Sequence, residues 1–206
     1  MAEVNPTEAR IRAATWKKRI KSIAGWGIFL FVLLAIIGGA VWYQKRSISH
    51  VPGKTYEDIG NQHIALSAPL PKPYNSNPPS SGAHFASPAN WGVYDYEVND
   101  KIFIHNLEHG GIWISYRPSV PTAVLEELGA IIQEYGGSKL VMAPRSANDM
   151  DIAVAAWTHV YAFNLESGAL ADARKEEVRA FYRAYKNRGP EFVPDSIPGV
   201  DPKAVQ

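Results

Sequence analysis

The longest apolar run of the chain lies near its N-terminus. Residues 23–43, IAGWGIFLFVLLAIIGGAVWY, carry no charge, and about 20 such residues suffice for a helix that crosses a bilayer. More basic residues precede the run than follow it. Only Lys45 and Arg46 follow it closely, whereas six precede it: Arg10, Arg12, Lys17, Lys18, Arg19 and Lys21. The positive-inside rule therefore predicts a transmembrane helix over residues 23–43, a basic cytoplasmic segment over residues 1–22 and an extracytoplasmic remainder, periplasmic or extracellular. A cleaved signal peptide is the alternative, although the run is longer than a usual h-region and no clear cleavage site follows it.

The pattern after this run predicts an α+β domain over residues 61–190, joined by a linker over residues 44–60. Lys101–Asn106 (KIFIHN) and Ile112–Tyr116 (IWISY) are rich in β-branched and aromatic residues and predict two strands paired as a hairpin across LEHGG. Apolar positions recur at helical spacing in residues 121–135, before Gly136-Gly137, and a second helix is predicted over residues 173–187. Residues 139–143 and 152–163 predict further strands. The expected fold is a small antiparallel sheet with two helices.

A long loop rich in proline precedes the predicted strands. It contains Pro52, Pro69, Pro71, Pro73, Pro78, Pro79 and Pro88, together with Gly, Ser and Asn, which argues for an extended, looped chain. Such a loop is uncommon in a compact domain unless it has a function. Residues 191–206 contain three more prolines and are predicted to form a loose tail.

Charge and composition exclude several classes of function. The net charge of +1 conceals a split, because residues 1–49 hold eight Lys/Arg against two Asp/Glu, and residues 50–206 hold thirteen against eighteen. Basic residues in the body are scattered among more numerous acids, so nucleic acid is not an expected partner. The chain has no cysteine, which excludes thiolate metal sites, cysteine nucleophiles and iron-sulfur clusters. A metal ion would depend on His, Met, carboxylate or backbone oxygen.

Four of the six histidines fall between residues 63 and 109 and raise the question of a metal site. HNLEHGG contains His105, Glu108 and His109 in the H-x-x-E-H order of inverzincin metallopeptidases, but those enzymes carry it on a helix. In a straight strand, residues four apart lie roughly 13 Å apart, so the chain would have to turn within residues 106–108 for both imidazoles to reach one ion. A histidine near a hairpin turn that bonds a carbonyl is the structural alternative. His84 ends NPPSSGAH, whose Pro-Pro and Ser-Gly restrict the backbone enough to aim a side chain.

A family resemblance is carried by NPPSSGAH (77–84), WGVYDY (91–96), HNLEHGGIWISY (105–116) and MAPR (142–145). These stretches resemble the DUF3105 family, membrane-anchored or secreted prokaryotic proteins of unknown function, over about residues 60–185. The family usually reads NPPTSGPH, so Ser80 and Ala83 depart from the pattern. The resemblance implies functional positions at His84, His105 and His109 and, more weakly, at His63. It implies no established activity.

Three hypotheses follow, and they leave open whether the protein is an enzyme. In the first, a copper or zinc ion binds His63, His84, His105 and His109, and Glu108 either orients these histidines or is a further ligand. Met142 would be a ligand only for reduced copper, because a methionine in an apolar strand is usually a core residue. In the second, the protein is an accessory subunit of a membrane complex, bound to the lipid bilayer, with structural histidines. In the third, it is a zinc hydrolase with Glu108 as base and an open coordination position.

Other groups are weaker candidates for chemistry. Ser80 or Ser81 with His84 offers a nucleophile and a base, but the sequence places neither an orienting acid nor an oxyanion hole. His159 lies in a predicted strand and His50 near the predicted membrane exit, and both are interpreted as structural.

Overall fold

The computed structural model describes residues 16, 25–39, 41 and 51–205, and the chain divides into two units, residues 1–50 and 51–206. Residues 25–39 are helical, and their side chains are exposed. Within the described residues, no helix has both the length and the apolar character needed to cross a membrane. Both ends of the predicted transmembrane run, most of the basic segment and His50 lie outside the described residues.

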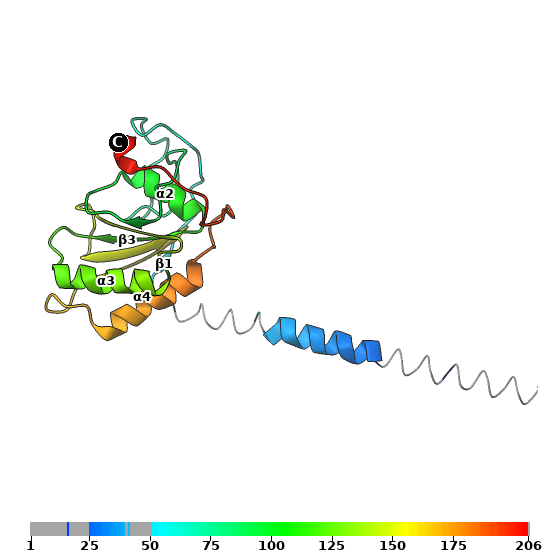
Figure 1. Ribbon diagram of the computed structural model, residues 1–206. Helices are drawn as coiled ribbons and strands as arrows, with labels where there is room; N and C mark the ends of the chain where they lie inside the picture. Colours follow the sequence, from blue (N-terminus) through cyan, green and yellow to red (C-terminus); the bar gives the residue numbers. More distant parts are fainter. Residues whose placement is uncertain (1–15, 17–24, 40, 42–50, 206) are drawn as a thin grey trace, which may run out of the picture. The chain divides into compact units, whose positions relative to one another are not determined.

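A six-stranded mixed sheet forms the centre of the second unit (Figure 1). Its order is β1-β6-β5-β3-β4-β2. The strands are β1 (Lys54–Thr55), β2 (Gly92–Val93), β3 (Ile112–Tyr116), β4 (Leu140–Pro144), β5 (Ile152–Ala156) and β6 (His159–Phe163). β4 pairs in parallel with β2 and β3, and the other pairs are antiparallel. The prediction of a purely antiparallel sheet was therefore wrong, because β3 reaches β4 through a helix and such a crossover joins parallel strands.

Helices cover both faces of this sheet (Figure 1). α3 (Thr122–Glu134) and α4 (Asp172–Tyr185) confirm the two predicted helices and lie on one face. α2 (Asp100–Glu108) and the long loop cover the other face, and η1 (Pro202–Ala204) is a short 3-10 helix near the C-terminus. The domain is thus α+β, and a separate apolar core is buried between each face of the sheet and the segments that cover it.

The predicted strand over residues 101–106 is wrong, because this segment lies in α2. Asn99 caps the helix by accepting a hydrogen bond from the Lys101 amide at 3.0 Å, and Asp100 places a negative charge in the first turn. Every residue from Ile102 to Glu108 is buried. A helix buried on all sides shows no polar stripe, and its Ile-Phe-Ile run therefore resembles a strand. The predicted hairpin across LEHGG is wrong for the same reason.

The long loop is confirmed, and it is tied down by hydrogen bonds. The His63 and His84 segments form a short parallel bridge, in which the Ile64 amide donates to the His84 carbonyl at 2.8 Å and the His84 amide donates to the Gln62 carbonyl at 2.9 Å. Elsewhere in the loop, the Tyr74 hydroxyl donates to the Ala83 carbonyl at 2.7 Å. The backbone bonds hold two loop histidines side by side.

The C-terminal segment, predicted as a loose tail, makes backbone hydrogen bonds with the rest of the domain. The Glu191 amide donates to the Glu108 carbonyl at 3.1 Å, and the Val200 amide donates to the Pro88 carbonyl at 2.8 Å. Gly189 lies so close to the end of α2 that a Cβ atom there would be 2.0 Å from the Glu108 carbonyl oxygen. These contacts bring residue 191 beside the end of α2.

Candidate metal centre

The C-terminal end of α2 carries three side chains that can bind a proton or a metal ion. His105 and Glu108 are three residues apart and share a face of the helix. His109 is the C-cap, and its amide donates to the His105 carbonyl at 3.1 Å. Gly110, with φ of 75°, then turns the chain toward β3. The literal H-x-x-E-H order therefore does lie at a helix, contrary to the sequence-based expectation.

Two loop histidines meet this helix end. The imidazoles of His63, His84 and His105 form a nearly equilateral triangle, with ring centroids 5.0, 5.0 and 5.1 Å apart. One carboxylate oxygen of Glu108, Oε2, lies 2.9 Å from the Nε2 atom of His84, 3.5 Å from that of His63 and 3.9 Å from that of His105. All four ligand atoms fall within 4.8 Å of one another.

These separations have the scale of a coordination shell. Zinc bonds of about 2.0–2.2 Å to nitrogen and oxygen place neighbouring atoms of a tetrahedron about 3.3–3.6 Å apart. The three distances from the Glu108 oxygen, 2.9 to 3.9 Å, lie on both sides of that value. An ion at the centre would thus require only small side-chain movements.

The second ring nitrogens of two histidines fix the tautomers that metal binding needs. The Nδ1 atom of His84 is 2.8 Å from the Gly82 carbonyl oxygen, and that of His105 is 2.7 Å from the Phe85 carbonyl oxygen. A carbonyl only accepts, so each Nδ1 carries the proton and donates it. In the neutral rings, both Nε2 lone pairs then point into the cluster. This is the usual arrangement around a metal-binding imidazole.

Burial and hydrogen bonding set the charges of the cluster. Burial by itself raises the pKa of Glu108, but the hydrogen bond from Asn61 Nδ2 to Oε1, at 2.7 Å, and the proximity of His84 outweigh it, so this pKa lies below its ordinary value. Burial lowers the pKa of His105. An ionised Glu108 carboxylate and a neutral His105 imidazole are the protonation states that a metal ion requires of these two residues.

His109 belongs to a neighbouring group of ligand atoms and not to the first. Its Nε2 atom is 3.0 Å from the Nε2 atom of His105 and 3.3 Å from Oε2 of Glu191. Glu108, His109 and Glu191 each offer a ligand atom, and these atoms are also within 4.8 Å of one another. Burial, followed by the proximity of His105, lowers the pKa of His109 to about 4.

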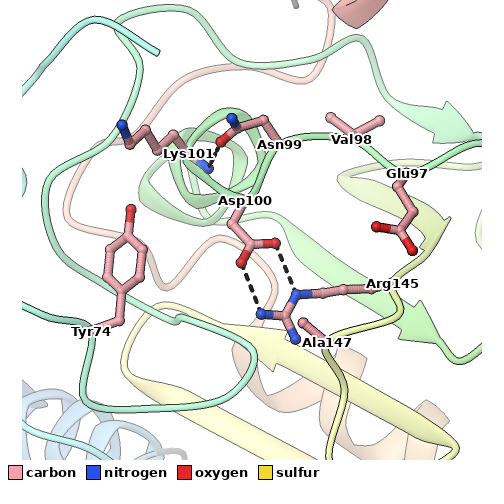
Figure 2. Close-up of a pocket in the computed structure, with 8 residues that line it drawn as sticks. All are labelled: Tyr74, Glu97, Val98, Asn99, Asp100, Lys101, Arg145 and Ala147. Atoms are coloured by element: carbon pink, nitrogen blue, oxygen red, sulfur yellow. Dashed lines mark hydrogen bonds and ion pairs between the residues drawn. The ribbon is translucent and has the colours of Figure 1, made fainter. Parts of the chain in front are cut away.

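Arg145 links the start of α2 to the loop that ends in His84. Its guanidinium binds both carboxylate oxygens of Asp100, at 2.9 and 2.8 Å, where α2 begins (Figure 2). The same side chain also donates to Oδ1 of Asn77, at the start of the loop that ends in His84. Arg145 and Asp100 line a pocket of about 480 Å³ with Lys101, and the Lys101 ammonium donates to loop carbonyls. The polar groups of this pocket therefore stabilise the fold that positions the cluster.

The structure brings together most of the residues singled out from the sequence. His63, His84, His105 and Glu108 form one cluster, and His109 lies next to it. Met142 is separate, because it is buried in the core under α3 and α4. Outside the cluster, His159 is half-buried, with Nδ1 2.8 Å from the Trp157 carbonyl oxygen.

Sequence reasoning missed three residues that complete this region. Arg145 belongs to the MAPR stretch, which was noticed as a motif but given no role. Asn61 lies two residues before His63, and this short separation in the sequence was a signal that its amide could reach the cluster. Glu191 lies 82 residues after His109 in the presumed tail, and no local pattern connects it with the cluster.

The family model described as "Protein of unknown function (DUF3105)" matches residues 70–196. Neither the proteins with curated descriptions nor the solved structures include a significant match.

Proposed function

Because the chain belongs to the DUF3105 family, which is described as being of unknown function, we propose a function from the geometry of its own residues: the domain binds a divalent zinc or copper ion. The ligands are His63, His84, His105 and Glu108.

One observation carries this proposal: three imidazole nitrogens and a buried carboxylate oxygen converge, while carbonyl groups hold the far side of two imidazoles. Without a cation or an added proton, the His84 lone pair would face the Glu108 carboxylate at 2.9 Å. That contact is repulsive in a buried site. A metal ion turns the same contact into two coordination bonds.

The donor set narrows the choice of ion. Imidazole suits zinc, copper, iron and nickel, and a carboxylate adds a harder ligand. The chain has no cysteine, and Met142 is buried in the core under α3 and α4, so sulfur ligation, which selects copper(I), gains no support. We therefore propose zinc(II) or copper(II), the two metals expected from the sequence, in preference to copper(I).

The role of Glu108 argues against the hydrolase alternative. A general base has to remain off the metal and reach a bound water. Here Oε2 of Glu108 lies among the three histidine nitrogens, and Oε1 accepts from Asn61. This arrangement favours Glu108 as a ligand. His63 is 46% exposed, so solvent reaches the cluster from its side.

We also propose that the N-terminal apolar run anchors the domain to the outer surface of a cell membrane. The uncharged stretch over residues 23–43 and the surplus of basic residues before it support this. Membership of a membrane complex is the related alternative, in which the histidines would be purely structural. Extraction of cell membranes with carbonate tests the anchor: protein that leaves the membrane fraction would contradict it.

Metal content is the decisive measurement for the proposed function. Full-length protein, purified in mild detergent with a tag that lacks histidine, would be loaded with zinc or copper, freed of excess ion and analysed by mass spectrometry. His63→Ala is the first variant, because the exposed side chain can be removed with little effect on folding. His84→Gln removes a buried ligand, and His159→Gln is the matched control, a histidine outside the cluster.

Bound metal in the parent and in His159→Gln, with loss of metal from folded His63→Ala and His84→Gln, is the expected result. A parent that takes up no zinc or copper would overturn the proposal. It would leave His84 and Glu108 as a structural ion pair and favour the accessory-subunit alternative.

A further inference from the structure

The residues next to the cluster form a second set of ligands. Glu108, His109 and Glu191 offer atoms within 4.8 Å of one another, and Glu108 is common to both sets. We infer that the centre is dinuclear: a second divalent ion binds Glu108, His109 and Glu191, and the Glu108 carboxylate bridges the two ions. This inference rests on the proposed function for the first ion.

The two sets are close enough together for a dinuclear site. Metal ions in two-metal centres are about 3.5–4 Å apart. The Nε2 atoms of His105 and His109, one from each set, are 3.0 Å apart. Each nitrogen can therefore bind its own ion at about 2 Å while the ions keep that separation.

The first ion changes the partner of His109. The Nδ1 proton of His105 goes to the Phe85 carbonyl, so the Nε2 atom of His105 is an acceptor. At 3.0 Å, His109 can satisfy it only by donating a proton. An ion on His105 takes up that lone pair and ends this hydrogen bond, and His109 can then carry its proton on Nδ1, which leaves its Nε2 lone pair free for an ion. Oε2 of Glu191, 3.3 Å from His109 Nε2, then becomes the nearest group with which His109 can share a second ion.

The backbone holds Glu191 in place for this role. Its amide donates to the carbonyl of Glu108 at 3.1 Å, and Gly189 permits the close approach of the C-terminal segment to the end of α2. The side chain of Glu191 is 48% exposed, whereas that of His109 is 12% exposed. The second position is therefore open to solvent through Glu191, as the first is through His63.

The second ion is expected to bind more weakly than the first and to have a more open coordination shell. It has three protein ligands, so water or an anion can complete its shell. The Lys139 ammonium donates to the carbonyls of His109 and Val193, which adds a positive charge nearby. Two carboxylates leave two divalent ions with excess positive charge, which favours an anionic ligand. Mixed imidazole and carboxylate donors suit zinc or manganese.

Zinc stoichiometry in the full-length protein tests the inference. Metal-free protein is titrated with zinc in competition with a chromophoric chelator. The variants are Glu191→Ala, which removes an exposed side chain, and His109→Gln. Glu126→Gln, an exposed carboxylate on α3 outside both ligand sets, is the matched control. A second readout is the electron paramagnetic resonance spectrum of the copper-loaded protein, in which two bridged copper(II) ions couple.

The parent and Glu126→Gln are expected to bind two zinc ions per chain, the second more weakly. Glu191→Ala and His109→Gln are expected to lose the weaker ion, retain the tighter one and show an uncoupled copper spectrum. One ion per chain in the parent, or two ions in Glu191→Ala, would overturn the second site and leave the proposed function intact. Absence of any bound ion would instead remove the proposed function itself.

Discussion

Glu108→Gln separates a metal ligand from a structural carboxylate, because it is expected to weaken metal binding without destabilising the metal-free protein. The glutamine oxygen can still accept from Asn61, as Oε1 of Glu108 does at 2.7 Å. The new amide can donate to the His84 Nε2 lone pair, which faces the carboxylate at 2.9 Å in the parent. Metal-free Glu108→Gln is therefore expected to be at least as stable as the metal-free parent.

The loss of metal affinity can be scaled from the number of ligands. Structural zinc sites with four ligands bind with about 10–16 kcal/mol, or about 2.5–4 kcal/mol per ligand when shared equally. At 1.4 kcal/mol per factor of ten, loss of the Glu108 ligand weakens zinc binding roughly 10²- to 10³-fold. In the parent, free zinc at 100 times its dissociation constant stabilises the fold by about 2.7 kcal/mol, which raises Tm by roughly 5–10 °C in a domain of this size.

Thermal unfolding of both proteins, with chelator and with zinc, is the assay. The parent is expected to gain the full increase in Tm on zinc addition, whereas Glu108→Gln gains little at the same zinc concentration. An equal increase in both would refute Glu108 as a ligand. A metal-free variant much less stable than the metal-free parent would refute the tautomer assigned to His84.

Three further predictions follow from the surroundings of the cluster. Arg145→Met breaks the partly buried pair with Asp100 and is expected to lower the free energy of unfolding by about 1.5–3 kcal/mol in denaturant titrations; a change below about 0.5 kcal/mol would contradict its role. Asn61→Ala removes a hydrogen bond to Glu108 and is expected to weaken zinc binding about 10- to 100-fold in chelator competition, and unchanged affinity would argue against that contact. In metal-free protein, the pKa of His109 is about 4 against an ordinary 6.5, so the unfolded chain binds more protons between these values and stability falls as pH drops from 6.5 to 4, by up to about 3 kcal/mol. His109→Gln should flatten this part of the stability profile, and an unchanged slope would refute the shift.

The helices of the domain differ in how far their sequences reveal them. α3 has buried Val124, Leu128 and Ile131 on one face and polar residues on the other, so its period is visible in the sequence. α2 is buried from Ile102 to Glu108, and complete burial removes the contrast on which such predictions depend. The strand predicted there failed because tertiary burial outweighs the preference of isoleucine and phenylalanine for strands.

The cluster was predictable in its members more than in its geometry. The sequence indicated His63, His84, His105 and Glu108 through three features: the proline-rich loop, the number of histidines, and the stretches NPPSSGAH and HNLEHGG. The separate position of His109 depends on a helix that the sequence concealed. Glu191 joins through the fold alone, because the C-terminal segment passes the end of α2.

The parallel bridge between His63 and His84 places two proposed metal ligands side by side in the long loop, so a bound ion would also hold this loop in place. An ion held by residues 63, 84, 105 and 108 would cross-link a long loop to a helix, and because it binds the folded chain it would stabilise that chain against unfolding. Extracytoplasmic domains commonly obtain such cross-links from disulfides, but this chain has no cysteine. With zinc, which has no redox chemistry, this loop would be cross-linked without thiol oxidation. The cross-link would persist in reducing and oxidising surroundings alike, and a chelator would remove it.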